Sequence, residues 1–266
     1  MKSGFSVFLA AIVALGLSWC GFVLGTVLQL GGQKQSPVLN SSEIYPNQRP
    51  GDATLGLQVY RANGCAACHT TQVNQDGVVC DVVLTHAGSH PETVSNLIAT
   101  LKLTGLTKDE ADAVSTQITA AGGKTETHIV PTGPDISRNW GMRHSVAEDF
   151  LWDYPVQIGS VRIGPDLANV GVRYDMNWEL AHLYAPQSVA QDSSMPPFRY
   201  LFITQKIGDA PSPDALKLTG DAAPAAGYEV VPTADAKNLA AYLVSLRANV
   251  PLFSAPFTTL AAPAQK

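Results

Sequence analysis

The stretch Cys65-Ala66-Ala67-Cys68-His69 places two thiols three residues apart and a histidine directly after the second thiol. This pattern is typical of covalent attachment of a c-type haem. Two thiols on one short turn can form thioethers with the two vinyl groups of a single haem, and the histidine that follows can present its imidazole to the iron. We therefore predict one covalent haem c, tethered by Cys65 and Cys68, with His69 as an axial ligand of the iron.

Other meanings of a C-x-x-C pair fit the rest of the chain less well. A zinc site requires a second Cys/His pair at similar spacing, and a thioredoxin-like dithiol lies at a strand-to-helix turn of a βαβ unit. The sequence offers neither context. The two other cysteines, Cys20 and Cys80, imply no disulfide framework, and we interpret them as small buried apolar residues.

The amino-terminal segment predicts a membrane helix. Residues 4–32 contain no charged residue, and the run at 5–30 is almost wholly apolar. As a helix of about 26 residues it would reach roughly 39 Å, more than the hydrocarbon core of about 30 Å requires. This length favours an uncleaved signal anchor over a removable signal peptide. A lipoprotein signal at Cys20 is disfavoured because a bulky tryptophan precedes the cysteine.

The predicted orientation follows from the haem, because haem c is attached on the outer side of the bacterial inner membrane. We expect a single-pass protein of the plasma membrane whose haem domain is periplasmic. A net charge of −5 provides no basic surface for nucleic acid. The expected parts are a transmembrane anchor, a linker, a mono-haem cytochrome c domain and a disordered tail, at residues 1–32, 33–52, 53–250 and 251–266.

Two helices are predicted at the ends of the haem domain. Residues 53–63 carry apolar side chains at helical spacing, and residues 233–246 form an amphipathic pattern that begins with a threonine N-cap. In class I cytochromes c the first and last helices cross where a small residue meets an aromatic one. Gly56, Tyr60 and Tyr242 can supply this contact, so we predict a mainly α, class I cytochrome c domain.

The second axial ligand is expected among the four methionines of the chain. Met195 lies in Ser-Ser-Met-Pro-Pro-Phe, a rigid extended segment that can hold a thioether against iron. Met142 and Met176 are interpreted as packing or surface residues. We predict Met195 as the ligand, with His182 and His144 as the alternatives, although a histidine on an amphipathic helix is more simply a core residue.

A proline turn is expected to hold the axial histidine. Gly164-Pro165-Asp166-Leu167 resembles the turn of class I cytochromes c in which the proline carbonyl accepts the ring N–H of the histidine and fixes its tautomer. Arg162 precedes this turn and is a candidate partner of a haem propionate. Its alternative role is that of a solvated surface arginine. We therefore assign cofactor-binding roles to Pro165 and, as a candidate, to Arg162.

A longer pattern carries a family resemblance. It comprises Asp153-Tyr-Pro-Val-Gln-Ile-Gly-Ser-Val-Arg-Ile-Gly-Pro-Asp-Leu167, Val170-Gly-Val-Arg-Tyr174, Trp178, His182-Leu183, Pro186 and Ser194-Met-Pro196. Together with the anchor, the linker and the terminal helices, it resembles the mono-haem cytochrome c subunit of cbb3-type cytochrome oxidases. The resemblance covers most of residues 1–75 and 135–250, and soluble cytochromes c lack the block at 152–167.

The resemblance implies a membrane-anchored electron relay of the respiratory chain that performs no bond chemistry itself. Its partners would be a haem-copper catalytic subunit that reduces oxygen to water, a di-haem cytochrome c subunit, and a soluble or membrane cytochrome c donor. The chain has no closely spaced Cys and His ligands for a copper site of its own. Two alternatives stay open: the cytochrome c subunit of a nitric oxide reductase, and a freestanding membrane-anchored electron-transfer cytochrome c.

Two segments depart from the family pattern. Thr70-Thr-Gln-Val-Asn74 follows the haem motif where the family has a Ser-Gln pair and an arginine. Residues 78–131 look like an inserted α/β module, which serves either as a docking surface or as a tolerated decoration. Its histidines are not spaced as metal ligands. Within it we expect strands at 79–84 and 124–130 and helices at 91–103 and 107–121.

Overall fold

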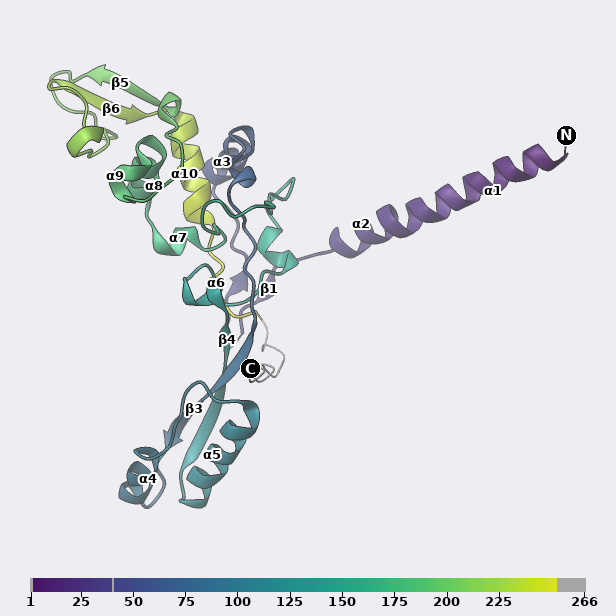
Figure 1. Ribbon diagram of the computed structural model, residues 1–266, viewed down its shortest axis with the longest axis vertical. Coiled ribbons are helices and arrows are strands. Elements are labelled where there is room, and N and C mark those ends of the chain that lie inside the picture. Colours follow the sequence, from purple (N-terminus) through teal and green to yellow (C-terminus); the bar gives the residue numbers. More distant parts are fainter. Residues whose placement is uncertain (1, 40, 253–266) are drawn as a thin grey trace, which may run out of the picture.

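The chain is built from helices and small separate sheets (Figure 1). The structure is a computed structural model that describes residues 2–39 and 41–252. Within these residues the secondary structure is mixed and mostly helical, and the strands form three two-stranded sheets. Of the tail predicted at 251–266, all but the first two residues lie outside the described residues.

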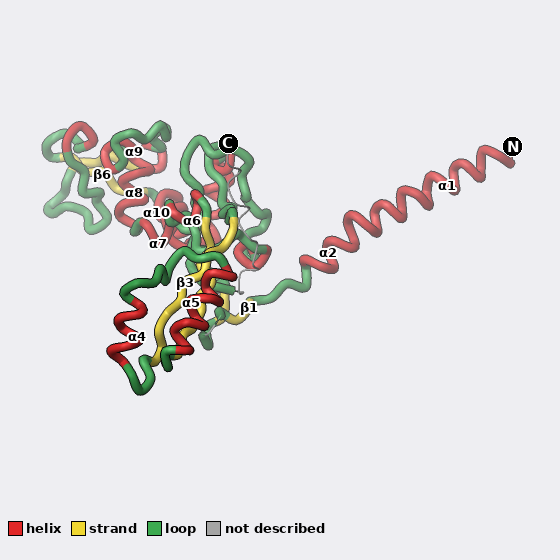
Figure 2. The backbone as a smooth tube through the Cα atoms, turned by 60° about the horizontal axis from the view of Figure 1, so that its bottom comes forward, coloured by secondary structure: helices red, strands yellow, loops and turns green. Residues whose placement is uncertain are grey.

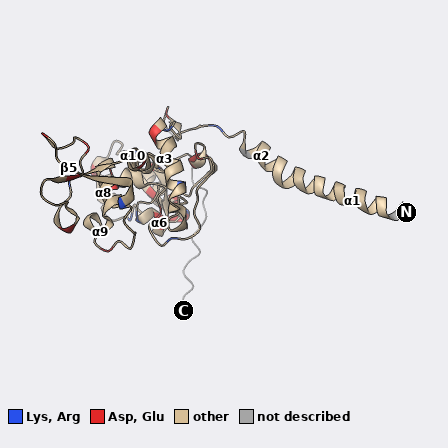
Figure 3. Cartoon of the chain, turned by 90° about the horizontal axis from the view of Figure 1, so that it is seen from above, with Lys and Arg blue, Asp and Glu red and all other residues tan. Residues whose placement is uncertain are grey.

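The amino-terminal helix extends away from the rest of the chain (Figure 1). Its stretch Gly4–Gln29 is long and apolar enough to cross a membrane, with a mean hydropathy of 2.4. No charged residue interrupts this stretch (Figure 3), and its most apolar part is not buried against other residues. So large an exposed apolar surface requires an apolar environment, so the helix fits the predicted single membrane crossing. Its parts are α1 (Lys2–Trp19), the π-helical turn η1 (Cys20–Leu24) and α2 (Gly25–Leu30).

The segment after the membrane helix folds back onto the domain that carries the haem motif. The backbone N–H of Leu39 donates to the carbonyl of Pro251 at 2.8 Å. Trp152 Nε1 donates to the carbonyl of Pro46 at 3.3 Å. The segment expected as a linker is therefore tied to the domain at several points. It contains β1 (Ser36–Pro37) and β2 (Ile44–Tyr45), which pair antiparallel.

The first and last helices of the domain cross at Gly56. A Cβ at this position would lie 1.9 Å from the carbonyl oxygen of Asn238, so only glycine permits so close an approach. The rings of Tyr60 and Tyr242 pack beside the crossing, with centroids 5.2 Å apart. The predicted contact is thus confirmed. The two helices are α3 (Gly51–Ala62) and α10 (Ala234–Ser245).

Short helices and a hairpin connect the haem motif to α10. α8 (Met176–Tyr184) packs against α10 and contributes Leu180 and Leu183 to the main core. No sequence pattern predicts the hairpin, in which β5 (Phe202–Lys206) and β6 (Tyr228–Pro232) pair antiparallel. The other elements of this part are η2 (Cys65–Ala67), α6 (Pro134–Ser137), η3 (Ala147–Phe150), α7 (Val170–Arg173), α9 (Pro186–Val189), η4 (Arg199–Leu201) and η5 (Gly220–Ala222).

Residues 77–132, here called the inserted module, consist of paired strands with helices beside them (Figure 2) and fold around an apolar core of their own. Its two strands pair antiparallel, α5 packs against both strands, and α4 packs against α5. The expected strands and helices are all present. The first helix ends early, at Ile98, because the chain returns to β3, where the N–H of Val82 donates to the carbonyl of Leu103 at 2.7 Å. The elements are β3 (Gly77–His86), α4 (Pro91–Ile98), α5 (Lys108–Ala120) and β4 (Lys124–Thr132).

Candidate functional site

The haem motif forms a tight turn directly after α3. Gly64 adopts a φ of 67°, which redirects the chain out of the helix. The N–H of His69 then donates to the carbonyl of Cys65 at 3.0 Å. Both cysteines of the motif are free and partly exposed. Burial raises the pKa of the Cys65 thiol to about 12, so this group is a neutral thiol at physiological pH.

The imidazole of His69 is held by the proline turn. Nδ1 of His69 lies 2.8 Å from the carbonyl oxygen of Pro165. A carbonyl can only accept, so Nδ1 carries the proton and Nε2 is left to bind a metal. Burial lowers the pKa of His69, which favours the neutral form that metal ligation requires. The contact expected from the proline turn is therefore present.

His69 and Met195 line one small cavity. Its walls are largely apolar, with Val170 from α7, Leu183 from α8 and Leu239 from α10. Two thiols, an imidazole and a thioether beside an apolar cavity form a donor set that suits a haem c. The cavity measures about 60 Å³, far below the roughly 300–1,000 Å³ of a typical cofactor site, so its walls must move apart when a macrocycle enters.

The two alternative ligands lie in different places. His182 lines the same cavity as Met195, and its Nδ1 is buried without a hydrogen-bond partner. Its ring stacks on Trp178, which in turn stacks on Tyr174. Burial lowers the pKa of His182 to about 4, so the ring is neutral and able to bind a metal. His144 does not line this cavity, so the geometry leaves Met195 and His182 as the candidates.

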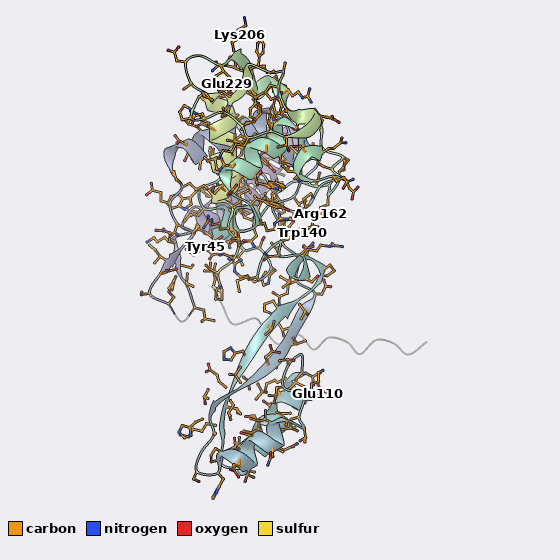
Figure 4. The ribbon with its side chains drawn as sticks, turned by 90° about the vertical axis from the view of Figure 1, so that its left-hand side faces the viewer. Tyr45, Glu110, Trp140, Arg162, Lys206 and Glu229 are labelled. Atoms are coloured by element: carbon orange, nitrogen blue, oxygen red, sulfur yellow. The ribbon has the colours of Figure 1, made fainter. Side chains whose placement is uncertain are left out.

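Arg162 is directed elsewhere. It does not line the cavity, and Figure 4 shows it beside Trp140. Its Nε donates to Thr70 Oγ1 at 2.8 Å, and its Nη1 donates to Asp135 Oδ1 at 2.9 Å. A further ion pair joins it to Asp166 at 3.3 Å. The guanidinium therefore ties the segment after the haem motif to two buried carboxylates, and its role at a propionate stays a prediction.

Two ionisable residues that sequence reasoning missed line the cavity instead. Arg173 is the last residue of α7, and Glu179 lies in the first turn of α8. Arg173 belongs to the run Val170-Gly-Val-Arg-Tyr174, but nothing in its spacing tells which way the side chain points. Burial raises the pKa of Glu179 to about 8. The carboxyl group is therefore mostly protonated at neutral pH.

Comparison with known proteins identifies one related family. Residues 127–221 match the family described as "Cytochrome C oxidase, mono-heme subunit/FixO". The matched span begins within β4, ends within η5 and includes both Pro165 and Met195. The haem motif precedes it. No curated protein matches the chain.

Proposed function

We propose that the chain acts as a mono-haem subunit of cbb3-type cytochrome c oxidase, the FixO family that residues 127–221 match, and we infer which residues hold its haem c. Cys65 and Cys68 tether the haem, His69 and Met195 ligate the iron, and Pro165 orients His69. The 2.8 Å contact between His69 Nδ1 and the Pro165 carbonyl carries this assignment, because it leaves Nε2 free in the cavity that Met195 also lines.

We also infer a class I cytochrome c fold for the domain. The close crossing of α3 and α10 at Gly56, the haem motif directly after α3, and the proline turn against the axial histidine support this fold. In chain order, the histidine follows α3, and the methionine loop lies between α9 and the β5–β6 hairpin that precedes α10. This order places ligands from two distant segments on one cavity.

The function we propose is electron relay without bond chemistry. When bound, the haem supplies reversible one-electron chemistry at its iron. The chain holds the imidazole in one tautomer through Pro165, offers the thioether of Met195, and surrounds both with apolar side chains. A methionine ligand and a poorly solvated site both raise the reduction potential relative to an exposed bis-histidine haem.

The partners we propose are a cytochrome c donor, the di-haem cytochrome c subunit, and the haem-copper subunit as acceptor, with the domain on the periplasmic side of the plasma membrane. The amino-terminal helix and the docked segment after it support a fixed position near the membrane. Residues 154–163 lie against the segment directly after the haem motif, where the N–H of Thr71 donates to the carbonyl of Ile158 at 2.9 Å. This loop exposes apolar side chains, including Tyr154 and Ile163, which suits a permanent apolar interface better than a charged encounter.

Purification of the full chain in detergent through a tag tests this function. We expect a covalent c-type haem, b haems and copper in the eluate, and oxygen consumption with a reduced cytochrome c donor. Nitric oxide turnover together with non-haem iron would assign the chain to a nitric oxide reductase. A c-type spectrum alone, without either activity, would indicate a freestanding carrier.

A further inference from the structure

The haem cavity is lined by two ionisable residues that the assignment above does not use. We propose that Arg173 and Glu179 form a carboxylate-binding subsite that holds a propionate of the haem. The inference rests on the proposed function, since it requires a haem in this cavity. It assigns the propionate to Arg173 instead of to Arg162, the candidate that the sequence offers.

The guanidinium of Arg173 has one buried donor nitrogen that lacks a hydrogen-bond acceptor. Its Nη2 donates to the carbonyl of Asp166 at 2.7 Å, which fixes the group beside the proline turn that holds His69. Its Nε is buried and has no hydrogen-bond acceptor. A buried donor without an acceptor is destabilising, more so in a charged group, and a guanidinium cannot shed its proton. Such a donor is therefore suited to an anionic ligand.

Arg173 is the one Lys or Arg among the described residues that line the cavity. A haem brings two propionate carboxylates into an apolar surrounding, where an unpaired charge is costly. Charge-assisted hydrogen bonds between a guanidinium and a carboxylate are the strongest that side chains can offer here. By contrast, Nε, Nη1 and Nη2 of Arg162 each donate to an acceptor within the protein.

Glu179 lines the same cavity as Arg173. It is 3% exposed, and its Oε1 has no hydrogen-bond partner. Because burial raises its pKa to about 8, the group is mostly a carboxylic acid at neutral pH and has an O–H to donate. The unpaired Nε of Arg173 and the unpaired oxygen of Glu179 match the two oxygens of one carboxylate ligand.

The reduction potential of haem c in the purified full chain tests the subsite. At pH 6, where Glu179 is protonated, we expect Arg173→Gln to lower the ratio of reduced to oxidised haem at a fixed ambient potential about tenfold. This change equals 59 mV for a one-electron couple. The ratio falls because the positive charge of Arg173 stabilises the reduced haem, and the variant lacks this charge. Arg61, exposed on α3, provides a matched control, and Arg61→Gln should keep the wild-type ratio.

Three further variants make every outcome decisive. Arg173→Gln combined with Glu179→Gln should lower the ratio of reduced to oxidised haem as much as Arg173→Gln alone. This double variant contains no buried acid that could ionise when Arg173 is removed. Arg173→Lys should retain the ratio within about threefold but shift the propionate band in the resonance Raman spectrum. The proposal would be overturned by an unchanged ratio of reduced to oxidised haem in the two variants that carry Arg173→Gln. It would also be overturned by an unchanged propionate band in Arg173→Lys, or by a fall in the ratio that occurs only in Arg162→Gln. If the wild-type chain carries no covalent haem, the proposed function fails and not the subsite alone.

Discussion

The imidazole of His69 lies directly against the backbone of Gly164. A Cβ at Gly164 would sit 2.2 Å from Cε1 of His69 and 2.7 Å from Nδ1, the atom that donates to the Pro165 carbonyl. The turn therefore both fixes the tautomer of the histidine and requires glycine at the preceding position. Orientation of the axial ligand depends on this backbone contact as much as on the hydrogen bond.

Gly164→Ala should disturb the axial histidine. Overpacking of this kind costs about 1–3 kcal/mol, and here the ring is the group that must move. We expect the visible and electron paramagnetic resonance spectra of the haem to lose part of their low-spin signal. Gly208→Ala is the control, because a Cβ at Gly208 has no atom within 4 Å. Identical low-spin spectra in both variants would contradict the role of His69.

The identity of the second ligand can be decided by one pair of variants. Met195→Leu should produce a high-spin haem with a lower reduction potential, because a thioether ligand raises the potential. His182→Leu should leave a low-spin spectrum, since its ring then serves only in the stack on Trp178. Met142→Leu, at an exposed methionine, controls for substitution itself. The reverse pattern, with loss only in the His182 variant, would assign the iron to His182.

Local signals in the sequence predicted the elements that contain them. The last helix begins where Thr233 accepts a hydrogen bond from the N–H of Ala236, as its N-cap pattern indicates. The hairpin escaped prediction because only Phe202 of β5 is buried, so the strand shows no alternation of buried and exposed residues. Its partner strand follows after a long loop, which provides no tight-turn signal.

In the site too, local sequence patterns could be predicted, whereas the directions of long side chains could not. The haem motif and the proline turn are short patterns whose chemistry can be inferred from their spacing. The direction of a long side chain is set by partners far away in the sequence. Arg162 turns to Asp135, whose carboxylate lies on α6, whereas Arg173 turns into the cavity. Spacing alone does not distinguish these two arginines, so the sequence offers Arg162 as the candidate partner of a propionate.

Gly56→Ala should destabilise the domain. Alanine normally gains roughly 0.5–1 kcal/mol over glycine inside a helix. At this crossing the added Cβ would meet the Asn238 carbonyl at 1.9 Å and Tyr242 Cβ at 2.7 Å, so the clash outweighs the gain and we expect a net loss of about 1–3 kcal/mol. Thermal unfolding followed by haem absorbance measures the loss. Gly51→Ala, with no atom within 4 Å of the new Cβ, should be neutral or stabilising.

The inserted module should respond to acid through Glu110 (Figure 4). Glu110 Oε2 accepts from the N–H of Thr107 at 2.8 Å in a capping box, and these hydrogen bonds lower the pKa of Glu110. The lowered pKa stabilises α5 above the ordinary glutamate pKa, and this contribution is lost as pH falls through the folded value. Hydrogen–deuterium exchange of α5 should therefore accelerate in acid relative to Glu110→Gln, whose amide still accepts. Equal rates in both proteins at every pH would refute this mechanism.

Arg49 and Asp153 form an ion pair that joins the segment after the membrane helix to the block before the proline turn, with side chains 9% and 3% exposed. Arg49→Met leaves a buried carboxylate without its cation, which should cost about 3–5 kcal/mol of unfolding free energy. Combining it with Asp153→Leu should restore much of that loss, because an apolar pair needs no compensation.

The exposed pair Lys237–Asp214 serves as the control for this cycle, since its side chains are 44% and 55% exposed. Lys237→Met should cost less than about 1 kcal/mol, because solvent screens such a pair. Thermal unfolding of the full chain in detergent measures all three variants against the wild type. Should Arg49→Met prove as mild as Lys237→Met, the pair would not hold the segment in place, and a fixed distance between haem and membrane would lose its structural basis.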